Sequence, residues 1–142
     1  ELQESENKTY KCLNNHCFDL SKEGYLNLLR VNKKKSNDPG DNEMMIAARR
    51  NFLEQGYYDP LIDAIKQTIE TELKFKKSSI NILDAGCGEG YYSQKALSDL
   101  AKLNTNVIGT DISKSAVKYA AKQYKNNFYF VRVKNSTKNV NR

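Results

Sequence analysis

The sequence has 142 residues, enough for one modest domain, and its 23 basic and 17 acidic residues give a formal charge of +6. This charge leans mildly towards polyanionic partners. No apolar stretch approaches the roughly 20 residues of a membrane span, no signal peptide is visible, and an odd number of cysteines argues against a disulfide framework. We therefore expect a cytoplasmic protein that does not bind a membrane.

The N-terminal part contains half of a candidate metal site. Cys12 and His16 have the Cys-x3-His spacing, and thiolate and imidazole are common ligands of structural Zn²⁺, which takes four donors. Cys17 is a conceivable third donor, although it directly follows His16. The alternative is a buried cysteine with an incidental histidine. Two donors are missing, and their expected place is upstream of Glu1.

Basic residues and two helices follow. The run Lys33–Lys35 suits phosphate contacts, or else a solvated loop. Asp41 is predicted to cap a helix that runs to Gln55, in which Met45, Ala48 and Phe52 share one face. Arg49 and Arg50 lie elsewhere on that helix and are expected to face RNA or water. A second, amphipathic helix is predicted from Pro60, with apolar residues at Leu61, Ile65, Ile69 and Leu73.

A strand, a glycine-rich turn and a helix form the centre of the chain. Ile80, Ile82 and Leu83 suit a buried strand, which ends in Asp84. Gly86, Gly88 and Gly90 allow positive φ and a close ligand approach. The third glycine of a dinucleotide fingerprint would fall at Tyr91, and the Gly-Lys-Ser/Thr of a phosphate loop is absent. Because Asp84 and Glu89 repel a pyrophosphate and attract a cation, the turn fits the sulfonium and ammonium of S-adenosylmethionine better.

A second acid follows the next predicted strand. Val107–Asp111 reads as a strand that ends in Asp111, at the distance from the glycines where a carboxylate accepts ribose hydroxyls. Ser113 is predicted to cap a helix, and Phe128–Val133 to form a third strand. The alternative is a glycine turn in a βαβ unit without a cofactor. The acid at each strand end favours the cofactor.

These elements predict an α/β protein with a partial, Rossmann-like methyltransferase fold of about three strands. The family resemblance given below implies a small zinc-binding module in front of this fold. The organisation it implies is an incomplete zinc-ribbon-like RNA-binding module at residues 1–36, a helical linker or lid at 37–79, and the N-terminal half of a methyltransferase domain at 80–142. The chain begins without Met, and only three strands are recognisable, so we expect a piece of a longer protein.

Several motifs, taken in order, resemble those of one known family. They are Cys12-x3-His16, Phe18-Asp19-Leu20, Lys22-Glu23-Gly24-Tyr25, Asp38-Pro39-Gly40-Asp41, Glu43-Met44-Met45, Ala48-Arg49-Arg50-x-Phe52-Leu53, Gly56 and Asp84-x-Gly86-Cys87-Gly88-Glu89-Gly90-Tyr91-Tyr92. Over about residues 8 to 131 the chain resembles the RlmA family of 23S ribosomal RNA methyltransferases. The resemblance implies methylation of ring nitrogen 1 of a guanine in a hairpin loop of 23S rRNA, with S-adenosylmethionine as the methyl donor.

The same resemblance implies ligands and contacts. A Cys-x2-Cys pair upstream would complete the zinc site of Cys12 and His16, whereas Cys17 matches no family ligand. The family's cofactor contacts correspond to Tyr58, Gly88 and Glu89. With the residues from the glycine-turn argument, the predicted cofactor-binding set is Tyr58, Asp84, Gly86, Gly88, Glu89, Gly90 and Asp111.

The chain departs from the family in two places. The tail from Val133 onward does not match, and the later strands that carry the target-base pocket are absent, so we expect this chain alone to be inactive. No catalytic base is assigned. The rival functions are a small-molecule methyltransferase and a non-catalytic zinc-ribbon protein that binds RNA. A homodimer is a further hypothesis.

Overall fold

The computed structural model describes residues 2–5, 8–29, 40–73, 80–98, 105–124 and 128–133. The elements are, in order, β1 (Leu2–Ser5), β2 (Thr9–Cys12), β3 (Cys17–Asp19), β4 (Leu26–Asn27), α1 (Glu43–Leu53), α2 (Asp59–Leu73), β5 (Ile80–Ala85), α3 (Tyr91–Leu97), β6 (Thr105–Asp111), α4 (Lys114–Gln123) and β7 (Phe128–Arg132). The basic run Lys33–Lys35, the linker 74–79 and the tail from residue 134 lie outside the described residues. None of the described helices is long and apolar enough to cross a membrane.

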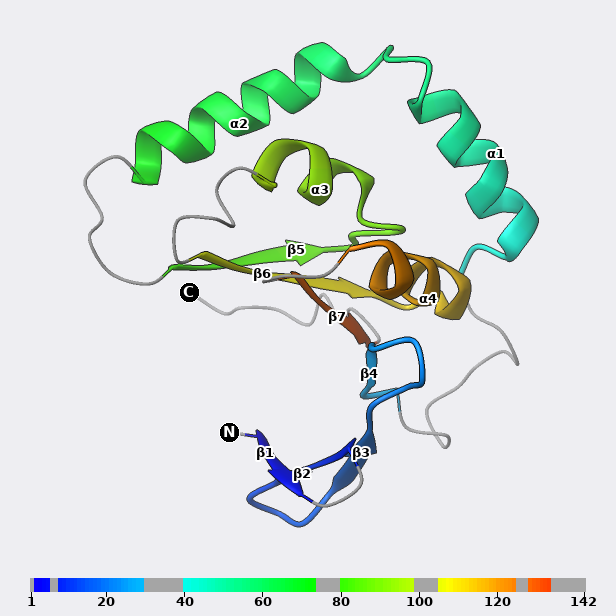
Figure 1. The fold of residues 1–142 in the computed structure, drawn as a ribbon, viewed down its shortest axis with the longest axis vertical. Coiled ribbons are helices and arrows are strands. Elements are labelled where there is room, and N and C mark those ends of the chain that lie inside the picture. Colours follow the sequence, from blue (N-terminus) through cyan, green and yellow to red (C-terminus); the bar gives the residue numbers. More distant parts are fainter. Residues whose placement is uncertain are drawn as a thin grey trace, which may run out of the picture.

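The main sheet has the strand order β4-β7-β6-β5, and its neighbouring strands pair in parallel (Figure 1). Helix α3 connects β5 to β6, and α4 connects β6 to β7. The α/β class and the three predicted strands are therefore confirmed. In this topology the carboxyl ends of β5 and β6 meet at one edge, where parallel sheets of this kind bind their ligands.

The N-terminal strands form a separate antiparallel sheet in the order β1-β2-β3. The chain then enters the main sheet, because Leu26 of β4 pairs in parallel with Val131 of β7. This edge strand was not foreseen from the sequence. It lies inside the range predicted for the zinc-binding module, so that range also contributes to the main sheet.

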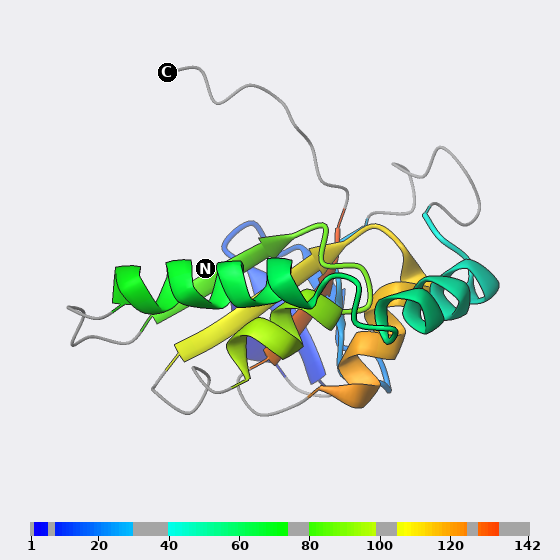
Figure 2. The same cartoon turned by 90° about the horizontal axis from the view of Figure 1, so that it is seen from above.

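The core lies on the face of the sheet that the helices cover. Figure 2 shows α2 and α3 lying over this face of the sheet. Ile82, Val107 and Phe128 belong to the core cluster that includes residues of α2 and α3. Val117 of α4 packs with Phe130 of β7 in a second cluster. Successive side chains of a strand alternate between faces. Leu83 therefore points away from the helices and is 64% exposed, so its prediction as a buried residue was wrong.

Helix α1 also differs from the prediction. Asn42, not Asp41, caps it, since the Asn42 side chain accepts a hydrogen bond from the backbone N–H of Met45 at 2.9 Å. Its buried residues are Ile46 and Leu53, whereas Met45 and Phe52 are half exposed. The face that Met45 and Phe52 share is therefore not the inward one, because packing against α4 and the core decides which face of the helix is buried.

Candidate functional site

The glycine-rich loop lies between β5 and α3 and is fixed by backbone hydrogen bonds to β6. The N–H groups of Gly86 and Cys87 both donate to the carbonyl oxygen of Thr110, at 2.8 and 3.0 Å. Gly88 has a φ of 56°, in the left-handed region that side chains with a Cβ rarely adopt. Gly90 also has positive φ and stands at the N-cap of α3. The glycines therefore serve the sharp turn from strand to helix that the sequence predicts.

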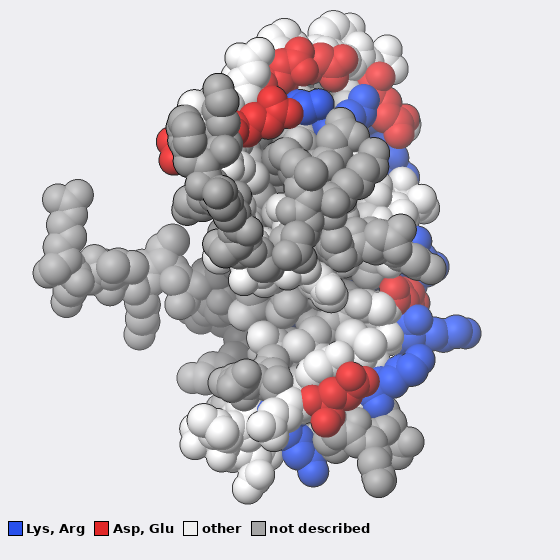
Figure 3. All heavy atoms as spheres, turned by 60° about the vertical axis from the view of Figure 1, so that its left-hand side comes forward, with Lys and Arg blue, Asp and Glu red and all other residues white. Residues whose placement is uncertain are grey.

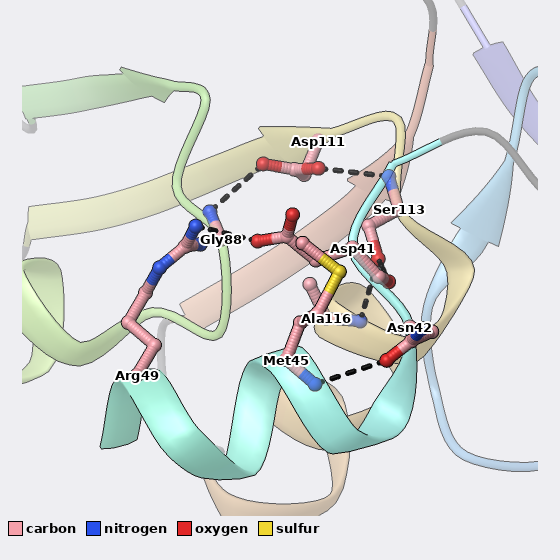
Figure 4. A network of polar contacts seen from close by, with 8 residues as sticks. All are labelled: Asp41, Asn42, Met45, Arg49, Gly88, Asp111, Ser113 and Ala116. Atoms are coloured by element: carbon pink, nitrogen blue, oxygen red, sulfur yellow. Dashed lines mark hydrogen bonds and ion pairs between the residues drawn. The ribbon is translucent and has the colours of Figure 1, made fainter. Parts of the chain in front are cut away.

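The carboxylates of Asp84 and Asp111 flank this loop on two strands. Asp84 accepts a hydrogen bond from the hydroxyl of Ser93 in α3. Asp111 accepts from the N–H of Gly88 at 2.9 Å and from the N–H of Ser113 at 2.8 Å (Figure 4). A carboxylate has about four acceptor positions, so these bonds leave Asp111 room for further donors. Both acids hold the loop in place, which the sequence argument did not anticipate.

The pKa of the Cys87 thiol is affected by the nearby carboxylates of Asp84 and Asp111. Burial, and then the negative charges of Asp84 and Asp111, raise the pKa of the Cys87 thiol well above its ordinary value of 9.0. The side chain therefore stays protonated and neutral near pH 7, and it packs in the core as a small apolar group.

A pocket of about 330 Å³ opens beside the loop. Its walls come from α1, the α1–α2 connection, the loop and the start of α3, and its lining residues are Arg49, Phe52, Leu53, Tyr58, Gly86, Cys87, Gly88, Glu89, Tyr91 and Tyr92. Tyr58 lies edge-on to Phe52 and to Tyr92, with ring centroids 5.9 and 6.3 Å apart. Within the described part of the chain, the pocket thus combines glycine backbone at its floor, an aromatic wall and one arginine.

Glu89 lines this pocket, but its negative charge is balanced by Arg50. It is 3% exposed, and one of its carboxylate oxygens accepts two hydrogen bonds from Arg50, at 2.9 and 3.2 Å. Burial acts to lower the pKa of Arg50, but the hydrogen bond and charge of Glu89 outweigh it, and the net pKa is raised. The Arg50 guanidinium also lies 3.5 Å above the ring centre of Tyr119 in α4. Arg50 therefore joins α1 to both the loop and α4.

Arg49 extends from the same helix into the pocket. It forms an ion pair with Asp41 at 2.6 Å, and Figure 4 shows its guanidinium beside Gly88. A Cβ on Gly88 would lie 3.9 Å from Arg49 Nη1. Asp41 is itself anchored, because its carbonyl accepts a hydrogen bond from the Ser113 hydroxyl at 2.6 Å. These contacts hold a half-exposed cation over the loop.

The candidate zinc ligands lie at the turn between β2 and β3. Cys12 Sγ is 3.3 Å from His16 Nδ1, and Cys17 bonds weakly to a backbone carbonyl. Among the described residues no group of three or more candidate ligands exists. Leu2 pairs with Cys12 in the β1–β2 ladder, so the start of β1 lies next to this pair.

Of the predicted cofactor residues, Tyr58, Gly86, Gly88 and Glu89 line the pocket, whereas Asp84, Gly90 and Asp111 support the loop behind it. The sequence argument did not assign Arg49 and Phe52 to the pocket. Arg49 and Phe52 are three residues apart, so they lie on one face of a helix, and Leu53 follows directly. This spacing was the sequence pattern from which their shared position in the pocket could have been predicted.

Two family models match the chain. Residues 1–37 match the zinc-ribbon model described as RlmA, N-terminal, and residues 76–140 match a methyltransferase domain. The resemblance found in the sequence is therefore confirmed. These matches lie on the antiparallel sheet with β4 and on the main sheet, respectively.

Two curated relatives match most of the chain. The 23S rRNA (guanine(748)-N(1))-methyltransferase of Streptomyces fradiae is 32% identical over 84% of this chain and 41% of its own length. A putative 23S rRNA (guanine-N(1)-)-methyltransferase of Bacillus subtilis (strain 168) is 38% identical over 78% of this chain and 38% of its own length. The chain thus spans about two fifths of the relatives that it matches. A solved plantazolicin methyltransferase in complex with SAH is 26% identical, with a TM-score of 0.45, over 67% of this chain and 36% of that chain.

Proposed function

Because this chain joins an RlmA-type N-terminal segment to a methyltransferase domain and is related to 23S rRNA (guanine-N1)-methyltransferases, we propose that the protein methylates ring nitrogen 1 of a guanine in 23S rRNA. The proposed target lies in a hairpin loop, where unpaired bases are accessible to a protein. The observation that carries the proposal is the pocket at the glycine-rich loop, with its aromatic wall and its single arginine.

The pocket fits S-adenosylmethionine, which supplies a methyl group on a positively charged sulfur. Gly86 and Gly88 place backbone without side chains at the pocket floor. The aromatic rings of Tyr58 and Tyr92 suit the sulfonium, since a cation is attracted to the face of a ring. Arg49 suits the carboxylate of the methionine part, and Asp111 keeps acceptor capacity for ribose hydroxyls.

The residues of this chain would bind and orient the methyl donor and limit its contact with water. Arg50 and Glu89 fasten α1 to the loop, and α1 closes one side of the pocket. Positioning of the reacting atoms is expected to supply much of the acceleration. Ring nitrogen 1 of guanine carries a proton at neutral pH that must leave, and no described side chain in the pocket is assigned as its acceptor.

We further propose that Cys12 and His16 are two of four zinc ligands. Their 3.3 Å approach supports this, since two ligands of one ion lie about that close or slightly further apart. The ladder partner of Cys12 is Leu2, so cysteines preceding β1 in a longer protein would continue towards the same turn. Such a closed site would stabilise the antiparallel sheet, in which the described strands bury little apolar surface.

The test uses the intact protein. Calorimetry should detect binding of S-adenosylmethionine, and transfer of a labelled methyl group should yield 1-methylguanine in a 23S rRNA hairpin transcript. The control transcript has adenine in place of each candidate guanine of the loop and should remain unlabelled. Cofactor binding with methyl transfer only to small molecules would support the rival small-molecule enzyme. RNA binding without cofactor binding would support the non-catalytic rival.

A further inference from the structure

A second pocket, of about 250 Å³, lies between α1 and α4. It shares no lining residue with the pocket at the glycine-rich loop, and α1 separates the two. Its lining residues are Glu43, Ile46, Ala47, Arg50, Ser115, Lys118, Tyr119 and Lys122. The proposed methyl-transfer site uses none of them except Arg50, which serves there through Glu89.

Helix α4 carries positive charge along one face. Its only charged residues are Lys114, Lys118 and Lys122, spaced four residues apart, so all three lie along one face. Like charges at this spacing repel each other, and the helix contains no acid to offset the repulsion. The ion pair of Lys118 with Glu23 is long, at 3.9 Å. An external anion would relieve this repulsion.

The donors at the pocket suit a phosphate group. Lys118 and Lys122 contribute ammonium groups, and Ser115 contributes a hydroxyl. The guanidinium of Arg50 adds positive charge from the side, although Glu89 occupies its hydrogen bonds. Among the described residues that line this pocket, Glu43 is the only acid. Phosphate is therefore favoured over a cation as the occupant.

The rest of the lining suits the sugar attached to such a phosphate. Ile46 and Ala47 of α1 contribute apolar surface, and Tyr119 adds an aromatic ring. A free inorganic anion would leave this apolar part unused. A nucleotide unit within a chain would use both parts, with its phosphate on the lysines and its ribose on α1.

The distribution of charge over the molecule also bears on the partner. Helix α2 carries Asp59, Asp63, Glu70 and Glu72 against one lysine. Figure 3 shows acidic side chains gathered along the top of the molecule, where α2 lies. An RNA strand would be repelled from α2 and attracted to α4.

We propose that the pocket between α1 and α4 binds a phosphate of the RNA backbone, with Lys118 and Lys122 as its main contacts. This inference rests on the proposed function, because it takes RNA as the partner. The proposed phosphate contact would hold the RNA on one side of α1, while the pocket for the methyl donor lies on the other side.

The test is the salt dependence of RNA binding by the intact protein. In Lys118→Gln/Lys122→Gln, the affinity for the hairpin RNA should fall roughly tenfold at low salt, and the slope of log K against log salt should fall by about one to two. The affinity for S-adenosylmethionine, measured by calorimetry, should not change. The matched control, Lys66→Gln/Lys95→Gln, removes the same charge from α2 and α3 and should lower the slope much less.

An unchanged slope in the α4 variant, or an equal fall in the control, would overturn this inference while leaving the proposed function standing. If the unaltered protein binds cofactor but no RNA, the proposed function itself fails. Polyglutamate provides the third comparison. If the α4 substitutions weaken binding of polyglutamate as much as binding of RNA, the pocket is not an RNA site.

Discussion

Arg50 of α1 donates both of its hydrogen bonds to a single carboxylate oxygen of Glu89, at 2.9 and 3.2 Å, where Glu89 is almost fully buried. The pair connects a helix to the glycine-rich loop across 39 residues of sequence. Breaking a buried ion pair on one side leaves an uncompensated charge, which costs more than removing both partners.

We therefore expect Arg50→Met to lower the free energy of unfolding by about 3 kcal/mol. In the double variant Arg50→Met/Glu89→Gln the buried charge is gone, and part of this loss should be recovered. Urea denaturation measures both. Equal stability of the single and double variants would mean that Glu89 is not charged or not buried in the folded protein.

The second prediction concerns Arg49 and the carboxylate of the methyl donor. Arg49→Gln should weaken binding of S-adenosylmethionine by about tenfold or more, because a charge-assisted hydrogen bond is lost. Decarboxylated S-adenosylmethionine lacks the group concerned, so its affinity should hardly change. Calorimetry on both ligands separates this role from a general loss of structure, which would weaken both equally.

The third prediction follows from the raised pKa of the Cys87 thiol. Below pH 9.0 the thiol is protonated in both the folded and the unfolded chain. Above that pH the unfolded chain loses the proton while the folded chain keeps it, so the free energy of unfolding should fall by about 1.4 kcal/mol per pH unit. Burial also raises the pKa of Tyr25, Tyr92 and Tyr124, whose ordinary value is 10.0, so these tyrosines add to the fall as the pH approaches 10. A variant that lacks only the Cys87 thiol keeps their contribution and therefore isolates that of Cys87.

Cys87→Ala should be less stable than the unaltered protein at pH 7 but should lose less stability between pH 9 and pH 10. Thermal unfolding at a series of pH values measures this. An identical pH dependence in both proteins would mean that the thiol is exposed to water.

The fourth prediction concerns Gly109 in β6. A Cβ there would lie 2.8 Å from the ring of Phe130 and 3.0 Å from the sulfur of Cys87, too close for either to remain in place. Gly109→Ala should therefore destabilise the fold by about 1–3 kcal/mol, since overpacking forces the core to shift. Gly24 has free space for a Cβ, but its φ of +99° would strain an alanine, so Gly24→Ala cannot serve as the control.

A suitable comparison for this variant is Gly109→Ala in a background with Phe130→Leu, which provides space for the added methyl group. The cost of the alanine should then be smaller. If the cost is the same in both backgrounds, as measured by urea denaturation, the strain does not come from Phe130.

Local patterns predicted much of the structure. The strand that contains Ile80 and Ile82, the cap at Ser113 and the helix that follows it all hold, because each depends on neighbours within a few residues. The glycine positions also predicted the loop, since positive φ is a property of the residue itself. The acids at the ends of β5 and β6 were placed correctly beside that loop.

Contacts between distant segments were not predictable in this way. The sequence allowed Arg49 and Arg50 to face either RNA or water. Their opposite orientations depend on Asp41 on one side and on Glu89 with Tyr119 on the other. Likewise, the pairing of β4 with β7 joins residues more than 100 positions apart and has no local signal.

The sequence by itself determined the strand-turn-helix unit, the two acids and the half zinc site, because residue type and short spacing fix local conformation and available chemistry. Only the tertiary structure decided that α1 forms a wall of the pocket, that Asp111 holds Gly88, and that Glu89 is neutralised by Arg50. These outcomes depend on which surfaces pack together, and packing is a property of the whole folded chain.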